Sequence, residues 1–167
     1  MGKRVTVIET NLKAGKKLQT AAPLEFRPDK TGNDGQEKNI LNVYGEVQYQ
    51  EIMGFGGAFT EATALNFSAL SAAQKQEVLD GYFDAEKGLG YNLCRLTINS
   101  CDFSEDFYSY DDTPEDFALK DFDISHDKKD IIPLVLRARE KSPGLRLFSS
   151  PWSPPAWMKT NGRMDKG

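Results

Sequence analysis

The middle and end of the sequence alternate three short apolar runs with two segments of helical pattern, and this order constrains the fold more than any other feature. The apolar runs are Gly54–Phe59, Tyr91–Ile98 and Leu145–Phe148. Between them, Leu70–Gly88 contains a capping box and apolar residues at helical spacing, and Asp127–Lys141 has a second helical pattern. The order strand, helix, strand, helix, strand is typical of a parallel α/β sheet with right-handed crossovers.

The first 49 residues have a different pattern, in which short apolar runs are separated by glycine and proline turn signals. The runs are Val5–Ile8, Leu24–Phe26, Ile40–Tyr44 and Val47–Tyr49, with a turn cluster at Gly32–Gly35. This pattern predicts antiparallel strands joined by hairpins. We therefore expect two parts, residues 1–49 with β-strands and residues 50–167 with the α/β order.

Composition and charge exclude several classes of protein. Hydrophobic residues make up 39% of the 167 and charged residues 28%, which is typical of a globular protein. The formal charge of −4 and the lack of a basic face argue against a nucleic-acid partner. No run of about 18 apolar residues exists, so we expect no integral membrane segment. The first ten residues lack the apolar core of a signal peptide, which leaves a cytoplasmic protein or a secreted one whose signal has been removed.

The cysteines, the histidine and the glycines limit the chemistry. Cys94 and Cys101 are too few for a disulfide scaffold, and we expect free thiols. The single histidine, His126, is placed in a loop; it excludes the usual His-rich metal sites and disfavours Ser-His hydrolysis within the chain. Gly54–Gly57 lacks the third glycine of a dinucleotide fingerprint. We expect neither a metal nor a cofactor.

Unusual residues follow each of the three predicted strands at its carboxyl end. They are Gly56–Glu61, Asn99–Ser104 and Ser149–Pro155. In a (β/α)8 barrel the active site is built at this end of the strands. Three βα units cannot close such a barrel, so this architecture predicts that the chain is the N-terminal part of one.

Asp102 and Trp152 follow consecutive predicted strands and are candidates for binding a sugar. An aromatic plane packs against the C–H bonds of a pyranose ring, and a carboxylate accepts hydrogen bonds from its hydroxyls. The alternatives are a buried packing role for Trp152 and a turn-capping role for Asp102. Arg95 lies inside an apolar strand, where it either points inward and needs a carboxylate partner or points outward to solvent. Glu61 is assigned to the start of a helix rather than to catalysis.

Five motifs in chain order resemble the signatures of the glucosylceramidase-like enzymes of glycoside hydrolase family 30. They are Gly54–Ala62, Leu93–Leu96, Ser100–Ser104, Tyr108–Tyr110 and Ser150–Gly162. The match is collinear from about residue 50 to the end, and several motifs in the right order are more specific than any one of them. Residues 1–49 are similar to the β-rich side domain with which members of the family begin.

The resemblance implies a fold and a set of residue roles. The fold is α/β, with the first three βα units of a (β/α)8 TIM barrel preceded by β-strands of a side domain. Asp102 and Trp152 line the glycone pocket, Phe103 shapes its wall, and Arg95 supports the catalytic carboxylates electrostatically. No catalytic residue lies within the chain, because the two glutamates of the family follow later strands.

The resemblance also implies an activity, which is retaining hydrolysis of a β-glucoside such as glucosylceramide, or of a related β-glycoside, by double displacement. A glycolipid substrate places the protein in sphingolipid metabolism, and the remainder of the barrel is the expected partner of this fragment, which alone is expected to be inactive. Two alternatives remain open: a non-catalytic sugar-binding or regulatory fragment, and a structural domain whose tryptophan and proline residues form a core.

Overall fold

The computed structural model describes residues 4–26 and 42–166, and the chain divides into two compact units, Met1–Gln48 and Tyr49–Gly167. The predicted turn at Gly32–Gly35 and the first two residues of the Ile40–Tyr44 run lie outside the described residues. No helix within the two described ranges has both the length and the apolar character needed to cross a membrane.

The first unit contains two pairs of short antiparallel strands. The strands are β1 (Arg4–Val5), β2 (Ile8–Asn11), β3 (Lys16–Thr20) and β4 (Leu24–Glu25). β1 pairs with β4, and β2 pairs with β3. The turn between β2 and β3 is the 3-10 helix η1 (Leu12–Ala14), which ends at Gly15 with φ of 69°. Glycine suits this left-handed position because it has no Cβ to clash.

The strands of this unit differ in extent from those that the sequence pattern predicts. Val5–Ile8 is not one strand, since β1 ends at Val5 and β2 begins at Ile8. Residues 42–49 contain no strand, and the Val47 amide instead closes a turn by donating to the Tyr44 carbonyl at 3.1 Å. None of the described residues before Tyr49 is buried. These described residues therefore include no packed core that would stabilise longer strands.

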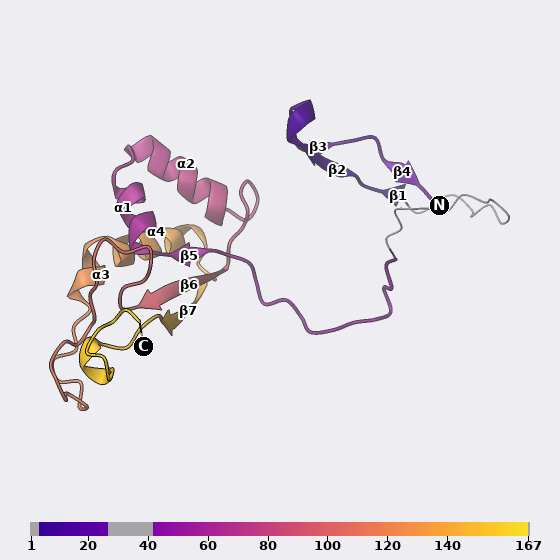
Figure 1. Ribbon diagram of the computed structural model, residues 1–167. Helices are drawn as coiled ribbons and strands as arrows, with labels where there is room; N and C mark the ends of the chain where they lie inside the picture. Colours follow the sequence, from indigo (N-terminus) through magenta and orange to yellow (C-terminus); the bar gives the residue numbers. More distant parts are fainter. Residues whose placement is uncertain (1–3, 27–41, 167) are drawn as a thin grey trace. The chain divides into compact units, whose positions relative to one another are not determined.

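The second unit is built on a parallel sheet with the strand order β5-β6-β7 (Figure 1). The strands are β5 (Ala58–Phe59), β6 (Leu93–Ile98) and β7 (Arg146–Pro151). β5 is shorter than the predicted Gly54–Phe59 run, although the Leu93 amide still donates to the Phe55 carbonyl at 3.2 Å. Gly56 is required here, because a Cβ at this position would lie 1.9 Å from the Leu93 carbonyl oxygen.

Four α-helices follow the first two strands of the sheet. They are α1 (Glu61–Ser68) and α2 (Ala72–Phe83) after β5, and α3 (Ser125–Lys129) and α4 (Ile131–Lys141) after β6; the 3-10 helix η2 (Ala156–Met158) follows β7. The predicted capping box between Ser71 and Gln74 is present at the start of α2. The helix predicted over 127–141 is broken at Asp130, and Pro133 lies in the first turn of α4, where proline is tolerated.

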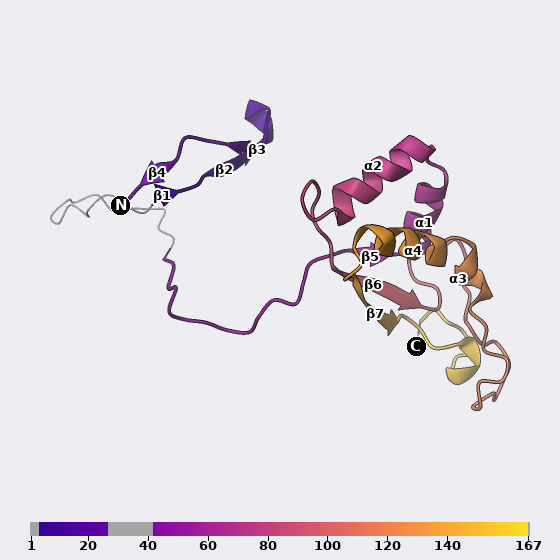
Figure 2. The same cartoon turned by 180° about the vertical axis from the view of Figure 1, so that it is seen from behind.

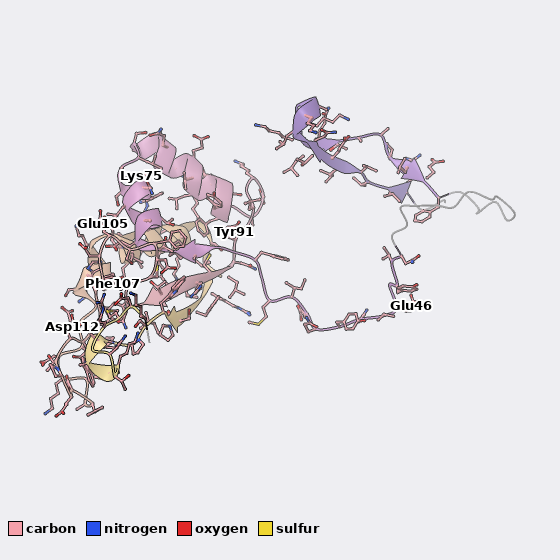
Figure 3. The ribbon with its side chains drawn as sticks, viewed as in Figure 1. Glu46, Lys75, Tyr91, Glu105, Phe107 and Asp112 are labelled. Carbon is pink, nitrogen blue, oxygen red and sulfur yellow. The ribbon has the colours of Figure 1, made fainter. Side chains whose placement is uncertain are left out.

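Helices α1, α2 and α4 pack on the same face of the sheet (Figures 1 and 2). The buried apolar residues of this layer are Phe59, Ala64, Leu79, Phe83, Cys94, Ile131, Leu134, Val135, Ala138 and Leu145. The rings of Phe59 and Phe83 stack with centroids 5.9 Å apart. Tyr91, which is labelled in Figure 3, meets Phe83 edge-on. This core holds the helices to the sheet through apolar burial.

The other face of the sheet carries Ala58, Arg95 and Phe148. These three residues are register partners across the strands, so their side chains share a face. Cys94 is buried among the helices with 2% of its surface exposed. Because successive side chains of a strand point to opposite faces, Arg95 points away from α1, α2 and α4. Phe148 is 51% exposed on this second face.

The core predicts that truncation of two leucines changes the free energy of unfolding by very different amounts. Leu79 on α2 is 1% exposed and Leu136 on α4 is 54% exposed. We expect Leu79→Ala to lower the free energy of unfolding by about 2–5 kcal/mol, through lost burial and a cavity. Leu136→Ala is the matched control and should change it by no more than about 0.5 kcal/mol. Urea denaturation followed by circular dichroism measures both; equal losses would contradict this description of the core.

Candidate functional site

The carboxyl ends of β5, β6 and β7 lie at one edge of the sheet, because the three strands are parallel. We call this the strand-end edge; it comprises Thr60, which follows β5, residues 99–104, which follow β6, and residues 152–155, which follow β7. Open α/β sheets bind ligands outside the carboxyl ends of their strands. The candidate site is therefore sought here.

Arg95 and Trp152 are in contact near this edge. The Arg95 Nε donates to the Ser150 hydroxyl at 2.8 Å, and the guanidinium carbon lies 5.3 Å from the centre of the Trp152 ring. Trp152 is 43% exposed, so it is not a fully buried packing residue. A cation over an aromatic face is attracted by the ring quadrupole. The arginine and the tryptophan thus orient each other.

Asp102 and Phe103 lie in a tight turn after β6. The Ser104 amide donates to the Cys101 carbonyl at 2.9 Å, and the Cys101 amide donates to the Ser104 hydroxyl at 3.1 Å. Asp102 is exposed and Phe103 is 59% exposed. Neither side chain hydrogen-bonds to Arg95 or Trp152 in the part of the chain that the structure describes. The structure brings Arg95 and Trp152 together, and it places Asp102 and Phe103 on the adjacent turn.

Glu61 is the first residue of α1 and is buried, with 7% of its surface exposed. One carboxylate oxygen lies 2.7 Å from His126 Nε2, and the other accepts from the Glu105 amide at 3.0 Å. The cap of α1 is the preceding residue, Thr60. His126 lies in α3 rather than in a loop, and its ring stacks on Tyr108. Glu61 therefore fastens the segment after β6 to α1 and α3.

Two tyrosines donate to one buried carboxylate. The Tyr108 hydroxyl donates to Asp127 Oδ1 at 3.0 Å, and the Tyr110 hydroxyl donates to Asp127 Oδ2. Burial raises the pKa of Tyr108, and the Asp127 charge raises it further. Burial also raises the pKa of Tyr110, together with its hydrogen bond to Asp127. Both phenols are thus held in the neutral form, in which they donate.

The segment after β7 is joined to the segment after β6 through Trp157. Its indole Nε1 donates to the Asp111 carbonyl at 2.9 Å, and Phe117 packs edge-on against its ring at 5.4 Å. Asp111 is 5% exposed, and its Oδ2 has no hydrogen-bond partner within residues 4–26 and 42–166. The two segments therefore form one layer at the strand-end edge.

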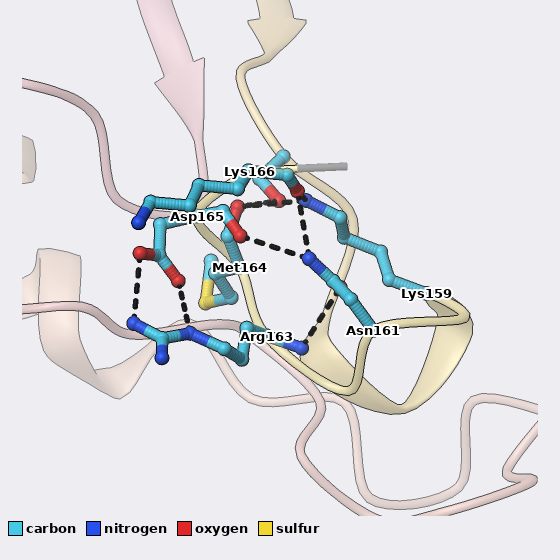
Figure 4. Close-up of polar contacts among 7 residues, drawn as sticks. Lys159, Asn161, Arg163, Met164, Asp165 and Lys166 are labelled. Carbon is cyan, nitrogen blue, oxygen red and sulfur yellow. Dashed lines mark hydrogen bonds and ion pairs between the residues drawn. The ribbon is translucent and has the colours of Figure 1, made fainter.

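Residues 159–166 close on themselves beside this layer (Figure 4). Lys159 Nζ donates to the Met164 carbonyl at 3.0 Å, and Arg163 forms two bonds with the Asp165 carboxylate at 2.7 and 2.9 Å. The Ser153 hydroxyl donates to the same Met164 carbonyl at 2.7 Å. The residue that follows Trp152 is thereby attached to a compact turn.

A cavity of about 560 Å³ lies on the helix-covered side of the sheet, away from Arg95. Apolar residues including Phe67, Val78 and Tyr82 line it, together with Thr63 and Asn66. It contains no carboxylate, so it lacks the groups that glycoside hydrolysis uses. The chemistry-bearing residues gather at the strand-end edge instead.

Sequence patterns place Asn99 and Ser150 in the segments at the strand ends, but they reveal neither the hydrogen bonds of these two residues nor the pairing of Glu61 with His126. The partners of Glu61 are 44 and 65 residues away in the sequence, and no local pattern encodes such contacts. The two tyrosines give one usable signal. Their spacing of two places both side chains on one side of an extended segment, where they can share an acceptor.

The tyrosine pair predicts a specific alkaline transition. Both pKa values are raised above the usual value of about 10, so the fold favours the neutral phenols. Their contribution to stability is complete below that pH and is lost as pH rises beyond it, because the unfolded chain releases these protons first. We expect a late phase in tyrosinate absorbance that coincides with unfolding. Tyr110→Phe should shrink it, and Tyr44→Phe should leave it unchanged; a wild-type titration without a late phase would contradict this.

Comparison with known proteins identifies relatives of this chain. A family model described as the glycosyl hydrolase family 30 TIM-barrel domain matches residues 52–167. The lysosomal acid glucosylceramidase of Mus musculus is 44% identical over 128 residues, which cover 75% of this chain and 25% of that protein. The endo-1,6-β-D-glucanase neg1 of Aspergillus fumigatus is 36% identical over 151 residues, which cover 87% of this chain and 30% of that protein.

A solved structure gives the same result. The crystal structure of SrfJ from Salmonella typhimurium matches with a TM-score of 0.84 at 33% identity, covering 99% of this chain and 36% of that chain. This chain spans about a quarter of the length of the mouse relative. The fold is α/β. Because the family model matches more than half of the sequence, the chain belongs to glycosyl hydrolase family 30.

Proposed function

We propose that the protein containing this chain is a retaining β-glycosidase, an O-glycosyl hydrolase that acts on a β-glucoside such as glucosylceramide or on a related β-glycoside. Family membership and the contact between Arg95 and Trp152 at the strand-end edge support it. Two of its relatives are named as a glucosylceramidase and an endo-1,6-β-D-glucanase. A glucose unit is the substrate feature common to both names.

In this proposal residues 50–167 supply the first three βα units of a (β/α)8 barrel, and residues 1–49 supply β-strands of a β-rich side domain. The parallel order β5-β6-β7 and the placement of α1, α2 and α4 on one face support it. A barrel keeps its helices outside and its other sheet face inside. The face with Ala58, Arg95 and Phe148 is then the inner face, which the remaining strands enclose.

Asp102 and Trp152 are assigned to the glycone pocket, with Phe103 forming part of its wall. Trp152 presents an aromatic surface to the C–H bonds of the sugar. The Asp102 carboxylate accepts no hydrogen bond from any residue in the described ranges, so its oxygens are available to sugar hydroxyls. A charge-assisted bond of this type is stronger than a neutral one and fixes the orientation of the ring.

Arg95 is assigned an electrostatic role toward the catalytic carboxylates. No carboxylate pairs with its guanidinium among the residues that the structure describes, and a half-buried arginine is costly without one. We place two glutamates on strands beyond Gly167, about 5–5.5 Å apart as retaining hydrolysis requires. One attacks the anomeric carbon while the other protonates the leaving oxygen, and water then releases the sugar from the first.

The glycone assignment is tested in the full-length protein by Asp102→Asn, which keeps the size of the side chain and removes its charge. Loss of a charge-assisted hydrogen bond costs about 1.5–3 kcal/mol, so kcat/KM should fall roughly 10–150-fold. Trp152→Ala should cost at least as much through loss of the sugar platform. Asp106→Asn is the matched control, since Asp106 is exposed in the same segment and has no assigned role. Steady-state kinetics on a chromogenic β-glucoside measures all three.

Normal activity of Asp102→Asn would show that the glycone pocket is wrongly placed. Glu61→Gln is informative beside it, because Glu61 is engaged by His126 and the Glu105 amide rather than by substrate. We expect this change to lower the unfolding temperature and to have little effect on kcat/KM.

The 167-residue chain by itself should not hydrolyse chromogenic β-glucosides above background, because the double displacement needs two carboxylates that we place outside it. It retains the proposed pocket residues, which is the basis of the alternative function as a non-catalytic sugar-binding fragment. Turnover that persists through further purification and disappears in Asp102→Asn would contradict the placement of the catalytic glutamates.

A further inference from the structure

Asn99 follows β6 directly and adopts an unusual backbone conformation with φ of 65°. Other non-glycine residues with positive φ in the described ranges are exposed: Leu18, Glu115, Leu119 and Lys166. Asn99, in contrast, is buried, with 5% of its surface exposed. The left-handed region disfavours residues with a Cβ, although asparagine tolerates it better than most. Glycine would satisfy the backbone alone, so the side chain needs its own explanation.

Both ends of the Asn99 side-chain amide are hydrogen-bonded to backbone from other segments. Its Nδ2 donates to the Ser153 carbonyl at 3.0 Å, and its Oδ1 accepts from the Tyr110 amide at 2.9 Å. Ser153 is the residue after Trp152. The Asn99 side chain therefore links the end of β6 to the segment that contains Trp152.

The same position also forms the base of the segment that contains Asp102. The Ser100 amide donates to the Tyr108 carbonyl at 3.0 Å, which closes residues 100–108 into a loop. Asp102 lies in the turn at the start of this loop. One buried side chain thus connects the two segments that contribute the proposed sugar contacts, and its two hydrogen bonds go to neither Asp102 nor Trp152.

We propose that Asn99 is a positioning residue that fixes Trp152 relative to Asp102 in the glycone pocket. This inference rests on the proposed function. The bond from Nδ2 to Ser153 holds the backbone next to Trp152, and the bond from Tyr110 holds the loop on the other side. Without the first bond, the backbone after Trp152 loses one of its attachments to the end of β6, while the β6–β7 pairing up to Pro151 and the Arg95–Trp152 contact remain. The aromatic platform is then held less firmly relative to the Asp102 carboxylate.

Two substitutions in the full-length protein separate the side chain from the backbone. Asn99→Asp keeps the shape and the acceptor for Tyr110 but replaces the donor to Ser153 by an oxygen. Asn99→Gly relieves the backbone conformation and removes both bonds. We expect Asn99→Asp to lower kcat/KM on 4-nitrophenyl β-glucoside by about tenfold, mostly through KM, as loss of one buried hydrogen bond predicts. Asn99→Gly should lower it at least as much, because it removes both bonds. Asn66→Asp is the control, since Asn66 also donates to a backbone carbonyl but from the exposed side of α1.

A double-mutant cycle tests whether Asn99 acts through Trp152. In a Trp152→Ala background, Asn99→Asp should lower kcat/KM by less than about twofold, because residues that act through each other are not additive. A merely structural role would leave the full effect in place, and that result would overturn the inference. Full activity of Asn99→Gly would overturn it as well, since the backbone alone would then suffice. If Asn99→Asp fails to fold, Asn99→Gly completes the same cycle.

The parallel variants separate this inference from the function on which it rests. If Asp102→Asn and Trp152→Ala leave the activity unchanged, the glycone assignment fails and the role of Asn99 fails with it. If those two variants lose activity while Asn99→Asp and Asn99→Gly keep it, only the inference about Asn99 is wrong.

Discussion

The pleat of β6 determines which side chains of the second unit are buried and which are available for chemistry. Successive residues of a strand face opposite sides of the sheet, so the burial of Cys94 beneath the helices directs Arg95 to the other face. There the guanidinium meets Ser150 of β7 and Trp152, which follows β7. A shift of one residue in the pairing of β6 would bury the arginine and expose the cysteine. The apolar core thereby positions the polar site.

Buried carboxylates hold the long segment between β6 and α4 in place. Glu61 and Asp127 are both 7% exposed, and burial of a charge is costly unless it is paired or hydrogen-bonded. Each has partners from more than one residue: His126 and the Glu105 amide for the first, two tyrosine hydroxyls for the second. A segment held in this way presents its turn at Asp102 in a defined position, which a binding site on a loop requires.

The order of strands and helices in the second unit could be predicted from the sequence, because long apolar periodicities are local signals. The capping box of α2 is local as well. Helix α1 is not predicted by the sequence pattern, since it has eight residues and a weak apolar face. The left-handed conformation of Asn99 and the pairing of Glu61 with His126 depend on tertiary contacts that no spacing encodes. The pattern at Val47–Tyr49 predicts a strand that the structure does not contain. None of the described residues before Tyr49 is buried, so no packed layer stabilises a strand there.

The contact between Arg95 and Trp152 also restricts how a sugar would approach in the proposed function. An indole ring has two faces, and the guanidinium lies over one of them at 5.3 Å. In the proposed function the pyranose packs on the opposite face of this residue, which is 43% exposed. The cation–π attraction and the bond from Arg95 to Ser150 oppose rotation of the ring in the absence of substrate. If Trp152 is the sugar platform that we propose, its ring is already ordered before binding, and less conformational entropy is lost when the ligand arrives.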